Sequence, residues 1–210
     1  MARRLRSGPG VRRSLNGSHS RAESIAHHSL VGYSFTPLRE EDLDLVRRWL
    51  LEPHVKRWWD DGVKTPYPDA EIADYREAIQ GKDTTYRYLA AIGDRPVGML
   101  QHYRIGDSPE YADALALGED AVGIDLFIGE AGLLGRGHGP AMLRQFLRDV
   151  AFPFHRMDVC VIGPSVKNAA AIRAYEKVGF RALKEVRVPG ETDPEFLMRI
   201  TAAELHSLQS

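Results

Sequence analysis

Residues 134–140 read Leu-Gly-Arg-Gly-His-Gly-Pro and stand between an apolar strand pattern, 122–129, and an amphipathic helix pattern that runs to Ala151. Three alternating glycines let the backbone come close to a ligand, because glycine tolerates conformations that side chains forbid. The free N–H groups of a first helical turn all point one way and attract anions. The stretch therefore predicts a pyrophosphate-binding loop, to which Arg136 and Arg144 add positive charge.

Other phosphate-binding loops fit this stretch less well. No Gly-Lys-Ser/Thr follows it, which excludes a Walker A loop. The loop comes late in the chain, after a predicted hairpin at 84–105, and not after the first strand of a βαβ unit, which disfavours a dinucleotide-binding fold. A flexible loop without a ligand stays open as an alternative, so the surrounding sequence decides.

Strand and helix patterns alternate around the loop. Strand patterns cover 33–36, 84–92, 96–105, 122–129 and 156–162, and Val186 with 196–200 closes the sheet. Helix patterns cover 40–51, a patch with Ile72, Tyr75 and Ile79, the stretch from 135 to 151, and 168–178. A polar loop is expected between 105 and 122. This order predicts a single α/β domain without internal repeats.

The composition is that of an ordinary soluble globular domain. The 210 residues are 43% hydrophobic and 27% charged, with 28 Lys plus Arg against 29 Asp plus Glu. A chain of this size needs no disulfide, and its single cysteine, Cys160, forbids an internal one. No apolar run approaches the ~20 residues of a membrane span, so we expect a cytoplasmic protein without a membrane partner.

The near-zero net charge hides an asymmetry between residues 1–30 and the rest. The first 30 residues hold six of the 28 basic residues and one of the 29 acidic ones, which leaves 22 basic and 28 acidic residues behind them. Their Ser- and Gly-rich composition predicts a disordered basic tail before a domain at 31–210. An Arg-rich, acid-poor start loosely resembles a transit peptide, whereas a nucleic-acid-binding arm is disfavoured and no nucleic-acid partner is expected.

A second motif lies downstream of the loop. Residues 168–180 read Asn-Ala-Ala-Ala-Ile-Arg-Ala-Tyr-Glu-Lys-Val-Gly-Phe. A glycine-rich loop that opens one helix, followed by Asn and a Tyr-Glu-Lys-x-Gly-Phe that closes the next helix, resembles the GCN5-related N-acetyltransferase (GNAT) superfamily. Shorter motifs in order between Tyr33 and Ala203 are similar to those of aminoglycoside 6'-N-acetyltransferases: Pro53 to Trp59, Pro96-Val97-Gly98, Gln101-His102-Tyr103, Gly123-Ile124-Asp125 and Pro164-Ser165-x-x-Asn168.

The resemblance implies a fold, a cosubstrate and a reaction. The fold is the GNAT fold, a single α/β domain with a central mixed, mostly antiparallel β-sheet flanked by helices. The cosubstrate is acetyl-CoA, and a primary amine attacks its thioester directly through a tetrahedral intermediate. The pantetheine is expected along the exposed edge of the strand at 123–129, whose N–H groups polarise the thioester carbonyl. The implied cofactor-binding residues are Leu126, Phe127, Ile128, Leu134, Gly135, Arg136, Gly137, His138, Gly139, Pro140, Asn168 and Lys177.

Two residues are predicted to be catalytic. Asp125 interrupts an apolar strand, and a buried acid needs a partner such as a cationic amine. In the resembling family the Asp at this position contacts the amine and is proposed to act as base, directly or through water. By the same resemblance Tyr175 lies near the sulfur, where its phenol protonates the leaving thiolate. From the residues alone, an Asp125 satisfied by backbone donors and a Tyr175 in the core stay open as alternatives.

The predicted acceptor is a cation. Between Ile105 and Gly135 there is no Lys or Arg, and such a segment attracts polycations, although a solvated acidic loop is the alternative. Its seven acids are Asp107, Glu110, Asp113, Glu119, Asp120, Asp125 and Glu130. Two tryptophans beside Asp60 and Asp61 predict an aromatic and acidic wall, with one of the two in the core. The predicted substrate-binding residues are Trp58, Trp59, Tyr75, Gln101, Tyr103, Glu110 and Asp125.

Two departures from the family pattern bear on the acceptor. The resembling enzymes usually carry Asp before Pro-Ser, where this chain has Gly163. The aromatic pair in the acidic loop of some of them is replaced by Ala112 and Asp113. We therefore expect a 6'-N-acetyltransferase of aminoglycosides, with a function in antibiotic resistance, whose acceptor preference is altered. An N-acyltransferase for a siderophore precursor, polyamine or peptide N-terminus, and a non-catalytic acyl-CoA-binding module, are the alternatives.

Metal chemistry and covalent catalysis are not expected. The eight histidines are scattered, with neither His-x-x-x-His nor Cys-x-x-Cys spacing. Cys160 sits in an apolar strand pattern, where a small buried residue is the default, so no acyl-enzyme is predicted. The protein is expected to be a monomer or a homodimer.

Overall fold

One seven-stranded sheet forms the centre of the protein. The computed structural model describes residues 32–60, 62 and 64–207, and the predicted basic tail, 1–30, lies outside this part. The strand order is β1-β2-β3-β4-β5-β7-β6, and every neighbouring pair is antiparallel except β4 and β5. The expected mixed, mostly antiparallel sheet is thereby confirmed. The strands are β1 (Ser34–Pro37), β2 (Tyr86–Ile92), β3 (Arg95–Arg104), β4 (Val122–Ile128), β5 (Val159–Ile162), β6 (Arg181–Val186) and β7 (Glu195–Thr201).

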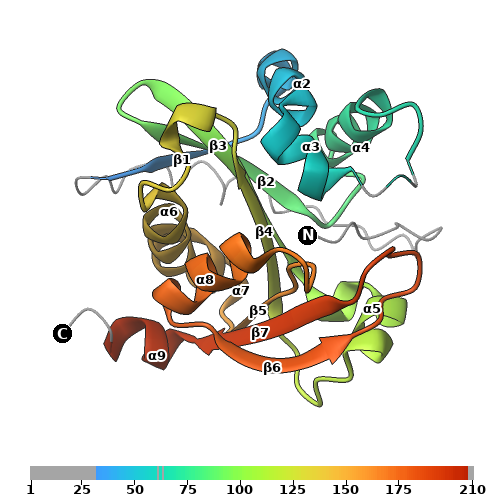
Figure 1. Cartoon of the computed structure of the whole chain (residues 1–210), viewed down its shortest axis with the longest axis vertical. Helices are drawn as coiled ribbons and strands as arrows, with labels where there is room; N and C mark the ends of the chain where they lie inside the picture. Colours follow the sequence, from blue (N-terminus) through green and yellow to red (C-terminus); the bar gives the residue numbers. More distant parts are fainter. Residues whose placement is uncertain (1–31, 61, 63, 208–210) are drawn as a thin grey trace.

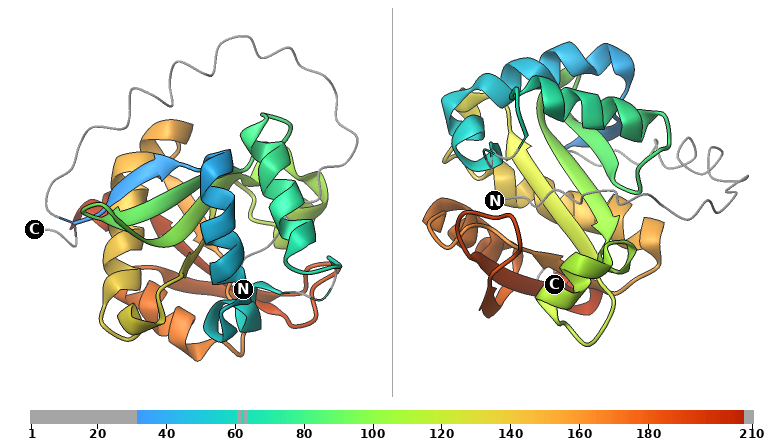
Figure 2. Two further views of the ribbon diagram at one scale, coloured as in Figure 1. Left: turned by 90° about the horizontal axis from the view of Figure 1, so that it is seen from above. Right: turned by 90° about the vertical axis from the view of Figure 1, so that its right-hand side faces the viewer.

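Helices cover both faces of the sheet (Figures 1 and 2). One face carries α2 (Leu43–Leu51), α3 (Pro53–Trp59), α4 (Asp69–Ile79) and α5 (Pro109–Leu115). The other face carries α6 (His138–Phe146), α7 (Phe152–His155) and α8 (Ala169–Val178), and a π-helical turn, Leu147–Ala151, joins α6 to α7. The short α9 (Ala202–Ser207) follows β7. Each face therefore has its own apolar core.

The helices pack through apolar residues at helical spacing. In α2, Leu43, Val46 and Leu50 follow one another at intervals of three and four and are all buried. In α6, Met142 and Phe146 occupy the matching positions one turn apart and are fully buried. The predicted helices at 40–51, around Ile72 and at 168–178 are confirmed in this way.

The sheet opens between its two central strands. Val122 pairs with Cys160 and Gly123 pairs with Val161, and there the parallel pairing ends. On the side of β5, residues 124–128 have no partner strand within the described part of the chain. On the other side, the whole of β4 pairs with β3. Figure 1 shows β4 diverging from β5 and β7 above this point. The opening exposes one backbone edge of β4 in the middle of the fold.

Two sequence predictions about local structure were wrong. A strand was expected from Arg156, but the chain stays helical through His155, and Arg156 ends the helix in the left-handed conformation with φ 54°. The strand therefore begins only at Val159. The expected polar loop after β3 contains α5, which starts at Pro109.

Candidate active site

Asp125 lies at the opening of the sheet and is held by its neighbour on β3. It faces Gln101 across the β3–β4 pair, and the Gln101 side-chain amide donates a 2.7 Å hydrogen bond to Asp125 Oδ2. Only 3% of Asp125 is exposed. Burial raises the pKa of its carboxyl to about 7, although hydrogen bonds from Gln101 and Tyr103 and the charge of Arg87 act in the opposite direction. A buried carboxyl that titrates near neutral pH is suited to accept a proton.

Tyr103 reaches Asp125 because the residue opposite it is a glycine. Tyr103 and Gly123 are register partners, and a Cβ at Gly123 would lie 2.2 Å from Tyr103 Cε2. The ring thus packs on the bare backbone of Gly123, and Tyr103 is buried. Gln101 and Tyr103, both predicted as substrate contacts, are brought together around Asp125, where they support the carboxylate.

Tyr175 lies on α8 close enough to Asp125 to feel its charge. Its side chain is half-buried, and the ring centroid lies 6.2 Å from that of Phe180. Burial, followed by the negative charge of Asp125, raises the pKa of the Tyr175 phenol above its usual range. The phenol is therefore protonated at neutral pH, as a proton donor must be.

The caps of α8 account for two residues of the sequence motif. Asn168 Oδ1 accepts a 3.1 Å hydrogen bond from the Ala171 N–H and caps the start of the helix. Gly179 ends the helix with φ 112°, a conformation that favours glycine. The structure thus shows Asn168 as the N-cap of α8, and its contact with the cofactor stays a prediction.

The glycine-rich loop is exposed and leads into α6. Gly135 and Gly137 have φ values of 71° and 83°, and no atom lies within 4 Å of where their Cβ atoms would stand. Gly137 is the N-cap of α6, so the first N–H groups of this helix have no partner inside the helix. Leu134 and Arg136 are exposed, whereas Gly139 and Pro140 are half-buried. The loop is therefore open at its glycines, and its predicted binding of a pyrophosphate stays a prediction.

Two polar side chains of this region serve the fold. His138 Nδ1 lies 2.6 Å from the Tyr33 hydroxyl, which ties α6 to the chain just before β1. Arg144 donates a 2.5 Å hydrogen bond to the carbonyl of Lys177 and ties α6 to α8. Of the two arginines that we expected to add charge to the loop, Arg136 is exposed within it and Arg144 is engaged elsewhere. The predicted roles of His138 and Lys177 toward a cofactor stay predictions.

Along β4, the backbone N–H and C=O groups of every second residue point toward the opening of the sheet. The Gly129 N–H donates a 2.9 Å hydrogen bond to the Val97 carbonyl, so the N–H and C=O groups of Leu126 and Ile128 point away from β3. The backbone groups of Phe127 point toward β3 instead. Among the three predicted cofactor contacts on this strand, the geometry favours Leu126 and Ile128.

The side chain of Phe127 belongs to the core. Its ring makes edge contacts with Trp49 and Trp59, with centroids 6.2 and 4.9 Å apart. On the open edge, His54 Nε2 lies 2.9 Å from the Ile128 carbonyl oxygen. The aromatic layer and His54 thus hold the end of β4 in place.

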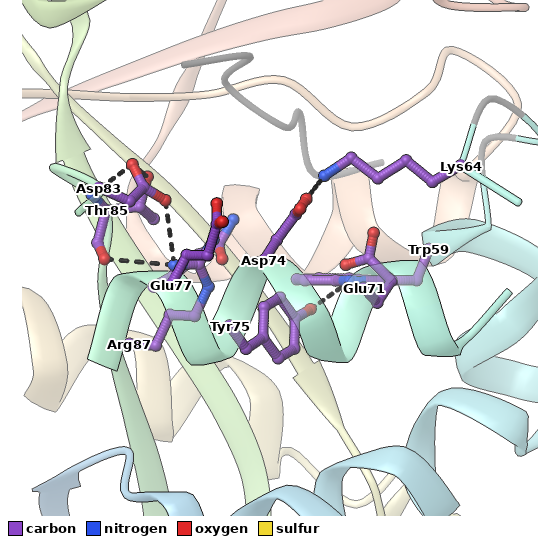
Figure 3. Close-up of a pocket in the computed structure, with 10 residues that line it drawn as sticks. Trp59, Lys64, Glu71, Asp74, Tyr75, Glu77, Asp83, Thr85 and Arg87 are labelled. Atoms are coloured by element: carbon purple, nitrogen blue, oxygen red, sulfur yellow. Dashed lines mark hydrogen bonds and ion pairs between the residues drawn. The ribbon is translucent and has the colours of Figure 1, made fainter. Parts of the chain in front are cut away.

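A polar pocket lies on the face covered by α4 (Figure 3), and Gln101, the hydrogen-bond partner of Asp125, is one of its lining residues. Its lining residues are Trp59, Lys64, Glu71, Asp74, Tyr75, Glu77, Asp83, Thr85, Arg87 and Gln101. Trp59 Nε1 donates a 2.8 Å hydrogen bond to the Tyr75 hydroxyl, and both side chains are buried. Three predicted substrate residues, Trp59, Tyr75 and Gln101, therefore meet here. Trp58 is absent from this lining and stacks with Arg57, whose Cζ lies 4.7 Å from its ring centroid.

Sequence reasoning missed the charged residues of this pocket. Two cations are paired with acids, Lys64 with Asp74 and Arg87 with Asp83. Glu71 lies one turn before Tyr75 on α4 and is buried. The spacing of four residues puts Glu71 and Tyr75 on one helix face, a signal that was present in the sequence.

The acidic segment after β3 is less free than its composition suggests. Three of its acids pair with arginines outside the segment: Asp120 with Arg104, Glu119 with Arg199 at 3.0 Å, and Glu130 with Arg95 at 2.7 Å. Glu110 is exposed on α5 and is absent from the lining of the pocket beside Asp125. Its contact with a substrate stays a prediction.

A second buried acid, Glu195, was also missed. It begins β7, is 2% exposed, and its Oε2 accepts a 3.1 Å hydrogen bond from the Tyr111 hydroxyl. Burial raises the pKa of the Glu195 carboxyl to about 8, and the charges of Glu191 and Asp125 add to the shift. Alternation with the buried Leu197 was the available sequence signal.

Within residues 32–60, 62 and 64–207, no group of three or more His, Cys, Asp or Glu side chains is arranged to hold a metal ion. None of the helices in this part has the length and apolarity needed to cross a membrane. Burial raises the pKa of the Cys160 thiol well above its usual range, which disfavours a thiolate nucleophile.

An opened central sheet, a glycine-rich helix start and a buried acid beside the opening together define an acetyltransferase. The chain belongs to the family described as "Acetyltransferase (GNAT) domain", whose model matches residues 39–188. The family expected from the sequence is confirmed.

Relatives with named activities support this assignment. The chain is 26% identical over 166 residues to an aminoglycoside N(6')-acetyltransferase type 1 of Klebsiella pneumoniae, which covers 79% of this chain and 82% of that enzyme. It is also 30% identical over 107 residues to an N-hydroxyputrescine acetyltransferase of Acinetobacter baumannii, which covers 50% of this chain and 47% of that protein. A solved structure of AAC(6')-Ib with ribostamycin and coenzyme A matches with a TM-score of 0.72 and 26% identity, over 85% of this chain and 98% of that one.

Proposed function

We propose that the protein is an acetyl-CoA-dependent N-acetyltransferase that acetylates a primary amine of a cationic small molecule, specifically the 6'-amine of an aminoglycoside. The observation that carries this proposal is the buried Asp125, held by Gln101 beside an acidic and aromatic pocket. Relatives that acetylate aminoglycosides at the 6' position support the choice of acceptor. An antibiotic-resistance function and a cytoplasmic location belong to the same proposal.

The residues at the opening fit the cosubstrate. The positions of Gly135 and Gly137 leave open space where side chains would stand, next to the unpaired N–H groups that begin α6. Leu126 presents its backbone groups to the opening and is suited to pair with the amides of a pantetheine arm. When bound, acetyl-CoA supplies the activated acetyl group.

The chain's own residues handle the protons of the transfer. The amine nitrogen forms a bond to the acetyl carbon while the carbon–sulfur bond breaks. Asp125 takes the proton that the amine loses, directly or through water, and Tyr175 gives a proton to the departing thiolate. The protonation states support these roles, because Asp125 titrates at about 7 and the Tyr175 phenol stays protonated.

The pocket beside Asp125 favours a cationic acceptor. Four of its lining residues are acids and two are bases, so its formal charge is negative. Each base is already paired, Lys64 with Asp74 and Arg87 with Asp83. The other two lining acids are Glu71 and Glu77. An ammonium group next to the rings of Trp59 and Tyr75 gains electrostatic attraction there.

A second candidate acceptor is a diamine that serves as a siderophore precursor. One relative acetylates N-hydroxyputrescine, a much smaller cation than an aminoglycoside. The acidic segment after β3 is partly neutralised by Arg104 and Arg199, which reduces its attraction for a large polycation. This candidate keeps the same cosubstrate site and catalytic pair.

The test measures thiol release from acetyl-CoA by the full chain. Kanamycin and tobramycin are compared with a 6'-hydroxyl aminoglycoside, N-hydroxyputrescine, spermidine and lysine. Turnover confined to acceptors with a 6'-amine is the expected result. Turnover with the diamines alone would replace the aminoglycoside by the second candidate, and coenzyme A binding without turnover on any amine would leave an acyl-CoA-binding module. Expression in a susceptible bacterium then tests resistance as growth at raised aminoglycoside concentration.

A further inference from the structure

Gly163 and Glu195 share one space beside the opening of the sheet. A Cβ at Gly163 would lie 2.2 Å from Glu195 Oε2 and 2.9 Å from its Cδ. Any side chain at position 163 would therefore collide with the carboxylate of Glu195 as it stands. Because position 163 is a glycine, the carboxylate of Glu195, on β7, can occupy the space where a side chain would stand.

Strand register brings Asp125 and Gly163 to the two sides of the opening. Gly123 pairs with Val161 in the parallel β4–β5 pair. β4 continues for two residues to Asp125, whereas β5 ends at Ile162 and Gly163 is the residue that follows it. Side chains two residues apart on a strand share a face. Asp125 therefore shares the face of Gly123, and Gly163 lies directly beyond the end of β5.

Glu195 projects from the same face of the sheet. It stands two residues before Leu197, which packs in one core cluster with Tyr103 and Val161. Burial, and then the negative charges of Glu191 and Asp125, raise the pKa of the Glu195 carboxyl. Two buried acids, Asp125 on β4 and Glu195 on β7, thus lie on one face of the sheet, on either side of the place where β4 leaves β5.

One oxygen of Glu195 is unsatisfied. Oε2 accepts the hydrogen bond from Tyr111, but Oε1 is buried without a hydrogen-bond partner among the described residues. The ion pairs of the described part of the chain do not include Glu195. A buried acceptor without a donor is costly, and a cationic ligand relieves that cost.

We propose that Glu195 is a specificity-determining residue that binds a second ammonium group of the acceptor while Asp125 receives the reacting amine. This inference rests on the proposed function and narrows it. The acceptor carries at least two amines, spaced to span the opening between β4 and β7.

Glu195→Gln is the informative variant, because it keeps the size of the side chain and an oxygen that accepts from Tyr111. Burial raises the pKa of Glu195 to about 8, so the kinetics are measured at pH 9, where the carboxyl is charged and the variant removes that charge. Tyr111→Phe is the matched control, since it removes the hydrogen bond and leaves the charge. A structural role for Glu195 would make Tyr111→Phe as harmful as Glu195→Gln.

The acceptors are chosen to separate one amine from several. Thiol release by the full chain is measured with kanamycin and N-hydroxyputrescine, which carry several nitrogens, and with 6-amino-6-deoxyglucose, which carries one. Glu195→Gln is expected to raise KM for the polyamines by about 10-fold to 100-fold, with kcat within about twofold, because an ionic hydrogen bond is lost. KM for the monoamine is expected to stay unchanged. An equal change for both kinds of acceptor would overturn the inference.

A charge swap gives a second test. Gly163→Asp combined with Glu195→Ala moves the carboxylate to the end of β5 and removes the collision. The double variant is expected to recover at least part of the preference for polyamines that Glu195→Ala loses. A folded double variant that keeps the KM values of Glu195→Ala would contradict the inference.

Binding measurements keep this inference separate from the proposed function. The dissociation constant of kanamycin from the coenzyme A complex is measured for wild type and Glu195→Gln. Binding that depends on Glu195 without any turnover would support the inference and refute the proposed acetylation. Turnover of amines with the same kinetics in wild type and Glu195→Gln would support the proposed acetylation and refute the inference. Wild-type protein that neither binds nor acetylates a polyamine would overturn both.

Discussion

The Gln101 side-chain amide holds the carboxylate of Asp125 from the position directly opposite on the neighbouring strand, with a hydrogen bond of 2.7 Å. Gln101 also lines the acidic pocket, so the residue that orients the acid also borders the space beside it. The same amide lowers the pKa of Asp125 against the larger effect of burial. Position 101 therefore controls both the direction and the protonation of Asp125.

Replacement of Gln101 by Leu is expected to raise the pKa of Asp125 further, because the charged form loses a donor. The acid limb of the pH dependence of kcat/KM should shift upward by roughly one pH unit. The profile is measured with acceptor at low concentration between pH 5.5 and 9. An unchanged limb would show that Asp125 is not the titrating base.

Asp125→Asn is expected to lower turnover by about 10²-fold to 10⁴-fold while the dissociation constant of coenzyme A stays the same. In the wild type, kcat/KM should fall as the pH drops through about 7, since the base must be ionised. Isothermal titration with coenzyme A and steady-state kinetics check the two parts. Loss of coenzyme A binding would contradict the assignment.

The same substitution should change how stability depends on pH. The pKa of Asp125 is about 7 in the folded protein and ~3.9 in an unfolded chain, so between these values the folded state holds an extra proton. The stability from this proton is complete below about pH 4 and is lost as the pH rises through about 7. Asp125→Asn escapes that loss, and its Tm advantage over wild type should grow from pH 5 to pH 8.

Tyr175→Phe is expected to lower kcat by about 10²-fold or more and to leave the fold intact, because the half-buried ring stays in place. The loss should be smaller with a thioester whose thiol is a better leaving group, since that thiolate needs less protonation. Kinetics with coenzyme A and thiophenol thioesters measure this difference. The same loss with both thioesters would refute a proton-donor role.

Gly137→Ala is expected to weaken the binding of coenzyme A by about fivefold to 30-fold. Its φ of 83° costs an L-residue roughly 1–2 kcal/mol, which alters the start of α6. Gly132→Ala is the matched control, because no atom lies within 4 Å of its Cβ position and its φ is outside the left-handed region. Equal effects of both variants would refute the cradle.

A buried histidine pair predicts loss of stability in acid. His102 Nδ1 lies 2.8 Å from His155 Nε2, and His102 is fully buried. Burial and the neighbouring His155 lower the pKa of His102 well below 6.5, and burial, with the charge of Arg104, lowers that of His155 to about 4. The unfolded chain takes up these protons first, so stability should fall as the pH drops from about 6.5 toward 4.

His102→Phe keeps an aromatic ring beside Tyr86 and Tyr88 and removes one titrating group. Its loss of Tm between pH 7 and pH 5 should be smaller than that of wild type. His206→Gln, on the exposed face of α9, should follow wild type. Parallel curves for His102→Phe and wild type would contradict the expectation.

Local patterns predicted the parts of the fold that depend on local sequence. The glycines at 135 and 137 and the caps Asn168 and Gly179 act within one or two turns of the chain, so their roles follow from spacing. The acid at 125 was found because it breaks the apolar alternation of its strand. The family resemblance supplied the chemistry of the catalytic pair.

Long-range pairings escaped prediction. The hydrogen bond from Arg144 to Lys177 and the ion pair of Arg199 with Glu119 join residues 33 and 80 positions apart, and no spacing rule announces them. The short α5 was read as a loop because its seven residues are too few for a clear period. The contact between Gly163 and Glu195 depends on how β5 and β7 pair, so it cannot be predicted from local sequence.

The collision between a side chain at position 163 and Glu195 restricts the order in which such a sequence can change. An acid gained at position 163 while Glu195 is present meets the existing carboxylate, and an acid gained at position 195 needs a glycine already at position 163. Unless the Glu195 side chain moves, descent from one arrangement to the other therefore passes through a chain with neither acid. Among relatives, long side chains at these two positions should exclude each other, and ancestral sequences with small residues at both should mark each exchange.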